Sequence, residues 1–473
     1  MNFNRDGRIL LDLLDHYYTQ SMNREKPVTR LVTIKELHEK LKLADHVEKG
    51  DLTGENLEKF LGDYLDHTTR LHHPGFFAHQ VGVPHPTGAL GSLIDGFTNN
   101  AMAIYEMGPA ASSIEFFMIN FLLEKIGWAP MPEDVTQRLS RRHGAGVLVH
   151  GGSLANMTAL LAARNHLDNT IRQDGNPGDL VILAPESCHY SISKSAGIIG
   201  IGENNVIGIE TDACGRIMVS KLEDAFNAAV SRQKRIVALV ANACSTGTGL
   251  YDPIDETADF CREKNIWFHV DGAHGGAALF SPAQRSRLKG IQKANSMIID
   301  AHKMLRTPTV CAALLVKDAF CLDHTFEHKA SYLFHDKKQP GFDFIGQAIE
   351  CTKAGLGLKF FMAFAAMGEK NLASYIDKTF ELAGLAYEYI SSQPDFEVPC
   401  RPESNILCFR FDASDDVQIK IRDELISQGS FHLSSTMLNE KRFLRIVVMN
   451  PASCMDDIEK LIQAVRKTGR MFL

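Results

Sequence analysis

Short apolar runs alternate with helical patterns between residues 86 and 365, and this alternation constrains the fold more than any other feature of the sequence. The runs cover residues 146–149, 180–183, 235–240, 266–270, 297–299 and 312–316. Strands that are apolar on both faces and separated by helices are typical of a parallel sheet covered by helices. The sequence therefore predicts an α/β fold with a mostly parallel central sheet in a large domain, residues 86–365.

The flanking regions have different patterns. Residues 1–85 have the helical spacing of Ile9, Leu10, Leu13 and Leu14, so we expect an N-terminal helical segment. Residues 366–473 read as helix, strand, helix, strand, helix, which predicts a small C-terminal α+β domain. At 473 residues the chain exceeds the size of one hydrophobic core, so more than one compact unit is expected.

Composition narrows the classes of partner. The net charge of −7 argues against a nucleic-acid surface, and no apolar run reaches the length that crosses a membrane. The ten cysteines show no CxxC pair and no ligand-like spacing, so we expect reduced thiols and no metal site. A cytoplasmic location and a small-molecule partner are the resulting expectations.

Two charged residues stand at the ends of predicted strands. Asp271 ends the apolar run 266–270, and Lys303 follows the run 297–299 after Asp300 and His302. A desolvated lysine can form an imine with an aldehyde, and a buried carboxylate can keep a pyridine nitrogen protonated. Alone, each residue is an ordinary surface charge; together, at the ligand-binding edge of a parallel sheet, they suggest pyridoxal phosphate.

A glycine turn precedes one predicted helix. His150-Gly151-Gly152-Ser153-Leu154-Ala155 joins the run 146–149 to a helical pattern. The free amides and positive dipole end of a helix N-terminus favour a phosphate. An ordinary turn with an N-cap is the alternative.

Two loops after other strands carry further candidates. His189 follows the run 180–183, where its imidazole could stack on a pyridine ring, although a core histidine would look the same. Thr246 follows the run 235–240 in a Thr/Gly loop that could place its hydroxyl near a cofactor or could be only a turn.

These residues have the order and spacing of a known family. From about residue 72 to 451 the chain resembles the group II pyridoxal-phosphate-dependent amino-acid decarboxylases, which include enzymes for glutamate, cysteine sulfinate, aromatic amino acids, histidine and 2,4-diaminobutyrate. The similar motifs are His73-Pro74-Gly75-Phe76-Phe77, Tyr105-Glu106-Met107-Gly108-Pro109, His189, Asp271-Gly272-Ala273-His274-Gly275-Gly276, His302-Lys303-Met304, Ala330-Ser331-Tyr332-Leu333-Phe334 and Arg445-Ile446-Val447-Val448-Met449-Asn450-Pro451.

The resemblance implies a fold of type I, the fold of many pyridoxal-phosphate enzymes. It also implies a homodimer in which the N-terminal segment of each subunit wraps around the partner. It implies that Lys303 bonds the cofactor, Asp271 pairs with the pyridine nitrogen and His189 stacks on the ring. The other cofactor contacts expected are Ser153, Leu154, Ala155, Thr246, Ala273, Asp300 and His302.

Tyr332 lies in a polar stretch, residues 329–341, that suits a loop closing over a site. In similar enzymes this tyrosine gives a proton to the carbon that loses carbon dioxide, so the resemblance implies decarboxylation to an amine. Without the resemblance it would be a surface tyrosine.

Three residues bear on the substrate. Arg445 alternates with apolar neighbours on a predicted strand, and its fork could bind a distal carboxylate or be structural. Phe77 and His79 lie where the resemblance implies a substrate pocket. Glutamate-type members have Phe-Phe-Asn-Gln where this chain has Phe76-Phe77-Ala78-His79-Gln80. Asp300 stands where many relatives carry Asn.

We therefore predict decarboxylation of an L-amino acid with an acidic or short polar side chain, such as glutamate, aspartate or cysteine sulfinate. A decarboxylase of 2,4-diaminobutyrate or of an aromatic amino acid, an aminotransferase of the same fold and a catalytically silent homologue are the alternatives.

Overall fold

The computed structural model describes residues 3–134, 142–326 and 341–473. Contacts divide the chain into two compact units. The large unit is Gln80–Glu381 with Pro402–Ser404, and the small unit is Met1–His79, Leu382–Arg401 and Asn405–Leu473. The division into residues 1–85, 86–365 and 366–473 stays a prediction.

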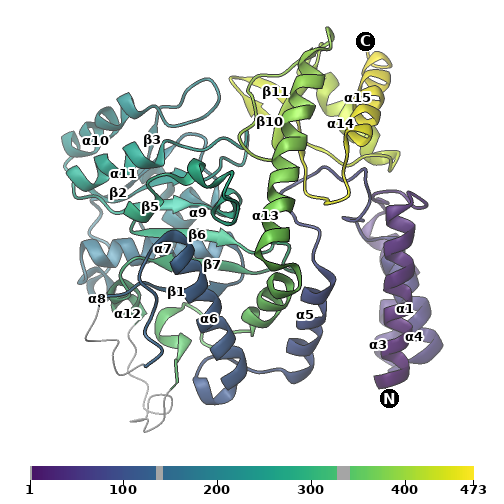
Figure 1. The fold of residues 1–473 in the computed structure, drawn as a ribbon, viewed down its shortest axis with the longest axis horizontal. Coiled ribbons are helices and arrows are strands. Elements are labelled where there is room, and N and C mark those ends of the chain that lie inside the picture. The colour runs from purple at the N-terminus through teal and green to yellow at the C-terminus, as the bar shows by residue number, and fades with distance from the viewer. Residues whose placement is uncertain (1–2, 135–141, 327–340) are drawn as a thin grey trace. The chain divides into compact units, whose positions relative to one another are not determined.

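The large unit contains a seven-stranded sheet in the order β1-β7-β6-β5-β4-β2-β3 (Figure 1). Only β7 is antiparallel to its neighbours, and the other pairs are parallel. This confirms the predicted α/β class. The strands are β1 (Ala145–Val149), β2 (Leu180–Pro185), β3 (Val206–Ile209), β4 (Arg235–Asn242), β5 (Phe268–Asp271), β6 (Ser296–Asp300) and β7 (Ala312–Val316).

Helices pack against this sheet. α7 contacts β4, β6 and β7, and its buried face includes Ala155, Ala159 and Ala162, whose small side chains allow close approach to the strands. The helices of this unit are α5 (Pro86–Thr98), α6 (Pro109–Ile126), α7 (Gly152–Leu167), α8 (Ile171–Asp174), α9 (Ser191–Ile198), α10 (Leu222–Ser231), α11 (Ile254–Glu263), α12 (Phe320–Phe326) and most of α13 (Leu356–Ser391). α13 bends at Gly368, which has a φ of 72° that only glycine adopts without strain.

Short 3-10 helices complete the large unit. They are η1 (Tyr105–Met107), η3 (Glu203–Asn205), η4 (Val219–Lys221), η5 (Gly275–Phe280), η6 (Arg285–Leu288), η7 (Ile291–Lys293) and η8 (Phe344–Gln347).

The small unit has an antiparallel sheet in the order β10-β11-β9-β8. Its strands are β8 (Phe396–Glu397), β9 (Ile406–Phe411), β10 (Ser434–Leu438) and β11 (Lys441–Val447). Its helices are α1 (Phe3–Met22), α2 (Ile34–Lys40), α3 (Leu43–Lys49), α4 (Gly54–Asp66), α14 (Asp415–Ser427) and α15 (Met455–Arg470), with the end of α13.

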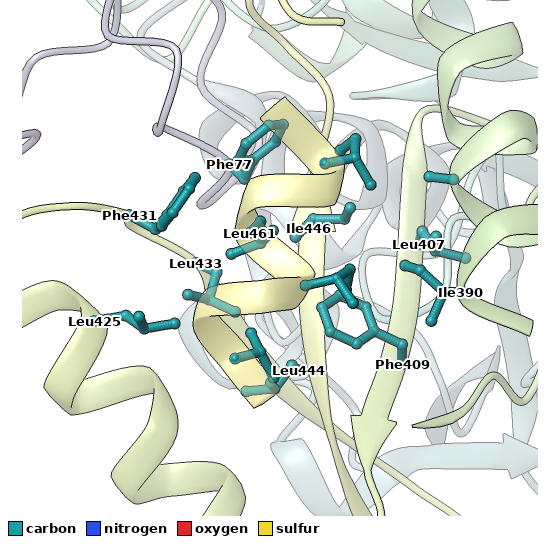
Figure 2. Packing of buried hydrophobic residues seen from close by; sticks show 14 of the residues in the cluster. Phe77, Ile390, Leu407, Phe409, Leu425, Phe431, Leu433, Leu444, Ile446 and Leu461 are labelled. Carbon is teal, nitrogen blue, oxygen red and sulfur yellow. The ribbon is translucent and has the colours of Figure 1, made fainter. Parts of the chain in front are cut away.

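The core of the small unit lies between this sheet and its helices. Figure 2 shows Leu461 of α15 beside Ile446 of β11, with Phe409 of β9 in the same cluster. These side chains are fully buried, and truncating one of them to alanine would cost about 2–5 kcal/mol.

Eight of the ten cysteines are free thiols, and Cys214 and Cys400 are not among them. The expectation that all ten are reduced is therefore wrong for these two residues. Among the described residues, no helix combines the length and apolarity that crossing a membrane requires.

Candidate active site

A cavity of about 280 Å³ opens in the large unit where β1, β4, β5 and β6 end and α7 begins. The ends of parallel strands leave backbone and side chains free to face a ligand. Eight residues predicted from the sequence line this cavity: Ser153, His189, Thr246, Asp271, Ala273, Asp300, His302 and Lys303. The fold thus brings together residues up to 150 positions apart.

Lys303 and Asp300 form an ion pair in the cavity. The Lys303 Nζ lies 3.2 Å from Asp300 Oδ2, and the Asp300 carboxylate is only 3% exposed. The amide of Lys303 donates to the carbonyl of Asp300 at 3.1 Å, so the chain turns directly after β6. This turn aims the lysine amine into the cavity.

The Asp271 carboxylate is held by two donors. Oδ1 accepts a hydrogen bond from the amide of Ala273 at 3.1 Å, and Oδ2 accepts one from Asn156 Nδ2 at 2.9 Å. Each oxygen keeps a lone pair, so the carboxylate can accept another proton or hydrogen bond from a ligand. The carbonyl of Ala273 accepts from the amide of Asp300 at 3.0 Å, which ties the ends of β5 and β6 together.

The glycine turn lies against Asp300. Gly151 has a φ of 100°, which favours glycine, and a side chain on Gly152 would place its Cβ 2.8 Å from both Asp300 carboxylate oxygens. The turn leads into α7, whose N-terminal dipole favours an anion. Both positions therefore need glycine, because a side chain would keep the backbone of the turn from reaching the wall of the cavity.

His189 is half-buried between charged neighbours. Its Nδ1 lies 2.8 Å from Ser191 Oγ. Burial lowers the pKa of His189, the charge of Lys303 lowers it further, and Asp271 opposes both effects. A neutral imidazole with an apolar face is therefore available beside the cavity.

His302 and Gly82 fix the backbone around the lysine. His302 Nδ1 lies 2.8 Å from the carbonyl oxygen of Cys311 and 3.3 Å from its amide nitrogen, so the ring is held against this backbone. A Cβ on Gly82 would lie 2.2 Å from the carbonyl oxygen of Lys303, so only glycine fits there.

Some predicted residues do not line the cavity. Leu154 and Ala155 lie in the first turn of α7, where their amides donate to the carbonyl of Gly151 at 3.1 Å. Tyr332 lies outside the described residues. Their cofactor and catalytic roles stay predictions.

The cavity is also lined by His150, Gly151 and Gly152 of the predicted glycine turn, and by four residues that were not predicted as site residues: Asn156, Asn242, Cys244 and His274. His150 Nδ1 lies 2.5 Å from Glu350 Oε1 beside the glycine turn. A polar side chain on the buried face of a helix, as at Asn156, is the signal that could have found one of them.

The predicted substrate residues belong to the small unit. Arg445 of β11 is buried and its Nη1 donates to Ser434 Oγ at 3.1 Å. His79 packs edge-on against His432, and burial followed by the charge of Arg445 lowers the pKa of His79. Phe77 is 0% exposed and lies in the core cluster of this unit (Figure 2), so its side chain packs with apolar neighbours. Its substrate role stays a prediction.

The chemistry of the cavity fits pyridoxal phosphate. It combines a primary amine, a buried carboxylate and a glycine turn at the start of a 16-residue helix. In addition, Asp300 Oδ1 is buried and has no hydrogen-bond partner among the described residues, which leaves an acceptor for a bound ligand or water.

Comparison with known proteins identifies the family. The sequence family described as "Pyridoxal-dependent decarboxylase conserved domain" matches residues 35–412. The chain belongs to this family. It is thus a pyridoxal-phosphate-dependent amino-acid decarboxylase, a carboxy-lyase, as the sequence predicted.

Relatives and solved structures agree with the family. The decarboxylase is 29% identical over 444 residues to the mouse "Acidic amino acid decarboxylase GADL1", a match that covers 88% of this chain and 78% of the relative. A crystal structure of mouse CSAD has 25% identity and a TM-score of 0.87 and covers 98% of both chains. A crystal structure of rice TDC with PLP and tryptamine, at 21% identity, has a TM-score of 0.86 over 100% of this chain and 99% of its own. The decarboxylase therefore has the type I fold.

Proposed function

We propose that this decarboxylase acts on an L-amino acid with an acidic or short polar side chain, such as glutamate, aspartate or cysteine sulfinate. The observation that carries the proposal is the cavity in which the Lys303 amine, the Asp271 carboxylate and the glycine turn meet. The choice of an acidic substrate is supported by relatives named as acidic amino acid decarboxylases in mouse and cattle.

Pyridoxal phosphate, when bound, supplies the electron sink that accepts the electron pair left behind by carbon dioxide. In the proposal, the amine of Lys303 holds the cofactor at its aldehyde carbon. Asp271 keeps a proton on the ring nitrogen, and His189 packs on the ring face. The glycine turn, Ser153 and His302 hold the phosphate.

Asp271 suits this role because its two existing hydrogen bonds come from neutral donors. The carboxylate therefore keeps its negative charge available for a ring N–H, and the low dielectric of the buried site strengthens that contact. Thr246 lines the same cavity and can place a hydroxyl near the ring.

The carbon that loses carbon dioxide needs a proton to give the amine. We assign this step to Tyr332, which lies outside the described residues. Tyr332→Phe would keep cofactor binding and shift the product from amine to aldehyde and ammonia, with dioxygen as the oxidant that is reduced to hydrogen peroxide. An unchanged amine yield would remove Tyr332 from the mechanism.

For the substrate side chain, the proposal uses Arg445 and His79. Arg445 offers a buried positive charge that can bind a distal carboxylate with two parallel hydrogen bonds. His79 adds a neutral ring, because burial and the Arg445 charge lower its pKa. We further propose that the enzyme is a homodimer.

The test measures carbon dioxide and amine from purified enzyme with added pyridoxal phosphate. The substrates are glutamate, aspartate, cysteine sulfinate, 2,4-diaminobutyrate and aromatic amino acids, and the products are identified by mass spectrometry. We expect release from acidic substrates only, and Arg445→Met should raise KM more than it lowers kcat. Release only from 2,4-diaminobutyrate or an aromatic amino acid would refute the acidic substrate, and dependence on a keto acid without carbon dioxide would indicate an aminotransferase.

A further inference from the structure

A buried chain of polar side chains runs from Trp267 to Asp271 in the large unit. Trp267 Nε1 lies 2.9 Å from Ser296 Oγ, which lies 2.8 Å from His269 Nδ1. His269 Nε2 lies 2.9 Å from Asn156 Oδ1, and Asn156 Nδ2 lies 2.9 Å from Asp271 Oδ2. We call Trp267, Ser296, His269 and Asn156 the Asp271 relay.

Each member of the relay is nearly inaccessible to water. His269 and Ser296 are 0% exposed and Asn156 is 1% exposed. A buried polar group that loses its hydrogen-bond partner costs about its full desolvation free energy. Breaking one hydrogen bond of the relay is therefore unfavourable, and each bond keeps its neighbours in place. The relay joins β5, β6 and α7 behind the cavity wall.

The Asp271 end fixes the direction of the hydrogen bonds in the relay. Trp267 Nε1 can only donate, so Ser296 Oγ accepts from it and keeps its own hydrogen for another partner. At the other end the Asp271 carboxylate only accepts, so Asn156 Nδ2 donates to it and Asn156 Oδ1 accepts from His269 Nε2. The Asp271 end therefore puts the proton of a neutral His269 on Nε2, and the bare Nδ1 accepts from the Ser296 hydroxyl.

The environment of His269 favours a neutral ring. Burial lowers the pKa of His269 to about 4, against the opposing pull of Asp271. The ring is therefore neutral near pH 7 and carries one proton. A neutral ring gives the relay a single arrangement in which all donors point toward Asp271.

Asn156 also connects the relay to His189. Asn156 Nδ2 donates its second hydrogen to Ser191 Oγ at 3.0 Å. Ser191 Oγ in turn lies 2.8 Å from His189 Nδ1 and donates to it, which leaves the proton of the neutral His189 ring on Nε2. One amide thus orders both the carboxylate and the histidine of the cavity.

We infer that the Asp271 relay is a set of positioning residues that holds the Asp271 carboxylate in the correct orientation for the ring nitrogen of the cofactor. This inference rests on the role of Asp271 in the proposed function. It assigns His269 and Asn156 to cofactor recognition although neither has to touch the ring.

The test compares how tightly the apoenzyme binds two cofactors by equilibrium dialysis. One is pyridoxal phosphate, and the other is 1-deazapyridoxal phosphate, in which a C–H replaces the ring nitrogen. The ratio of their Kd values isolates recognition of that nitrogen. His269→Phe removes the donor to Asn156, whereas His269→Gln keeps an amide donor near the position of Nε2.

We expect wild type to prefer pyridoxal phosphate and His269→Phe to lose about tenfold of that preference, the size expected for a weakened hydrogen bond to a charged group. His269→Gln should restore most of the preference. Asn165→Ala, which removes a buried amide at the other end of α7, should leave the ratio unchanged.

Other results would overturn the inference. If His269→Phe raised both Kd values equally, the relay would only support the fold. If wild type itself bound the two cofactors equally, the proposed role of Asp271 would fail first, and the inference with it. Should His269→Phe not fold, Ser296→Ala removes a single hydroxyl of the relay and must lower the same ratio for the inference to stand.

Discussion

The carboxylate of Asp300 and the amine of Lys303 lie 3.2 Å apart at the exit of β6, where the Asp300 side chain is 3% exposed and that of Lys303 is 16% exposed. A charged lysine in such a place needs a counter-charge, which Asp300 provides. The same carboxylate lies against Gly152 of the glycine turn. One buried acid therefore connects the lysine with the turn that begins α7.

Replacing Lys303 with alanine should abolish turnover, because no other described lysine lines the cavity. The visible absorption band that pyridoxal phosphate gives on its lysine should also disappear. Spectra and carbon dioxide release of Lys303→Ala check both effects. Lys317→Ala, an exposed lysine beyond β7, is the control and should behave as wild type. Turnover by Lys303→Ala would disprove the assignment.

Gly152→Ala should weaken cofactor binding. The new Cβ would lie 2.8 Å from the Asp300 carboxylate, so the turn or the acid must move. A shift at a charged or phosphate-binding contact costs about 1.5–3 kcal/mol, or roughly 10- to 100-fold in Kd. Fluorescence titration of the apoenzyme with pyridoxal phosphate measures this loss.

The matched control for that variant is Gly96→Ala in α5, where a Cβ would meet nothing within 4 Å. It should bind the cofactor normally and be slightly more stable, because alanine favours a helix. Equal cofactor affinity in Gly152→Ala and Gly96→Ala would show that the turn tolerates a side chain.

Much of the sheet could be predicted from the sequence, because buried parallel strands are continuously apolar. The runs 146–149, 180–183 and 312–316 fall within β1, β2 and β7. β3 was missed because it has four residues and is only partly buried, so it lacks that signal.

The site was predictable where side chains stand at strand ends. Asp271, Lys303 and His189 line one cavity, as the topology of a parallel sheet requires. Asn156 and His269 were not predicted, because the sequence shows a polar residue within an apolar helix or strand but not the partners that give it a role. Phe77 was expected in a substrate pocket but packs in a core, since an apolar side chain suits both environments.

A buried ion pair should make Lys353 important for stability. Lys353 is 1% exposed and pairs with Glu115, which is 0% exposed and also accepts from the amide of Leu148 in β1 at 2.9 Å. Burial raises the pKa of Glu115, and the charge of Lys353 opposes that rise. Lys353→Met would leave a carboxyl group buried without its counter-charge, at a cost of about 3–5 kcal/mol.

Urea denaturation of Lys353→Met measures that cost. Lys221→Met is the control, because Lys221 pairs with Glu210 at 3.2 Å on the surface and its loss should leave stability nearly unchanged. Similar midpoints for Lys353→Met and wild type would mean that Glu115 takes up a proton and tolerates its isolation.

His269 should make part of the stability depend on pH. A histidine in an unfolded chain titrates near pH 6.5, whereas burial lowers the pKa of His269 to about 4. The unfolded state therefore takes up this proton first as the pH falls. The contribution of His269 to the free energy of unfolding is complete above about pH 6.5 and declines by about 3 kcal/mol toward pH 4.

His269→Gln removes the titration of His269 and leaves that of other buried groups, such as Asp252, whose pKa burial raises to about 7. The difference between wild type and this variant therefore isolates the contribution of His269. We expect the free energy of unfolding of wild type to fall relative to that of His269→Gln between about pH 7 and about pH 4.5. Urea denaturation of both proteins at each pH gives the difference between their free energies of unfolding at that pH. A constant difference would mean that His269 takes up its proton at the same pH in the folded and the unfolded state, which would contradict a ring kept neutral by burial.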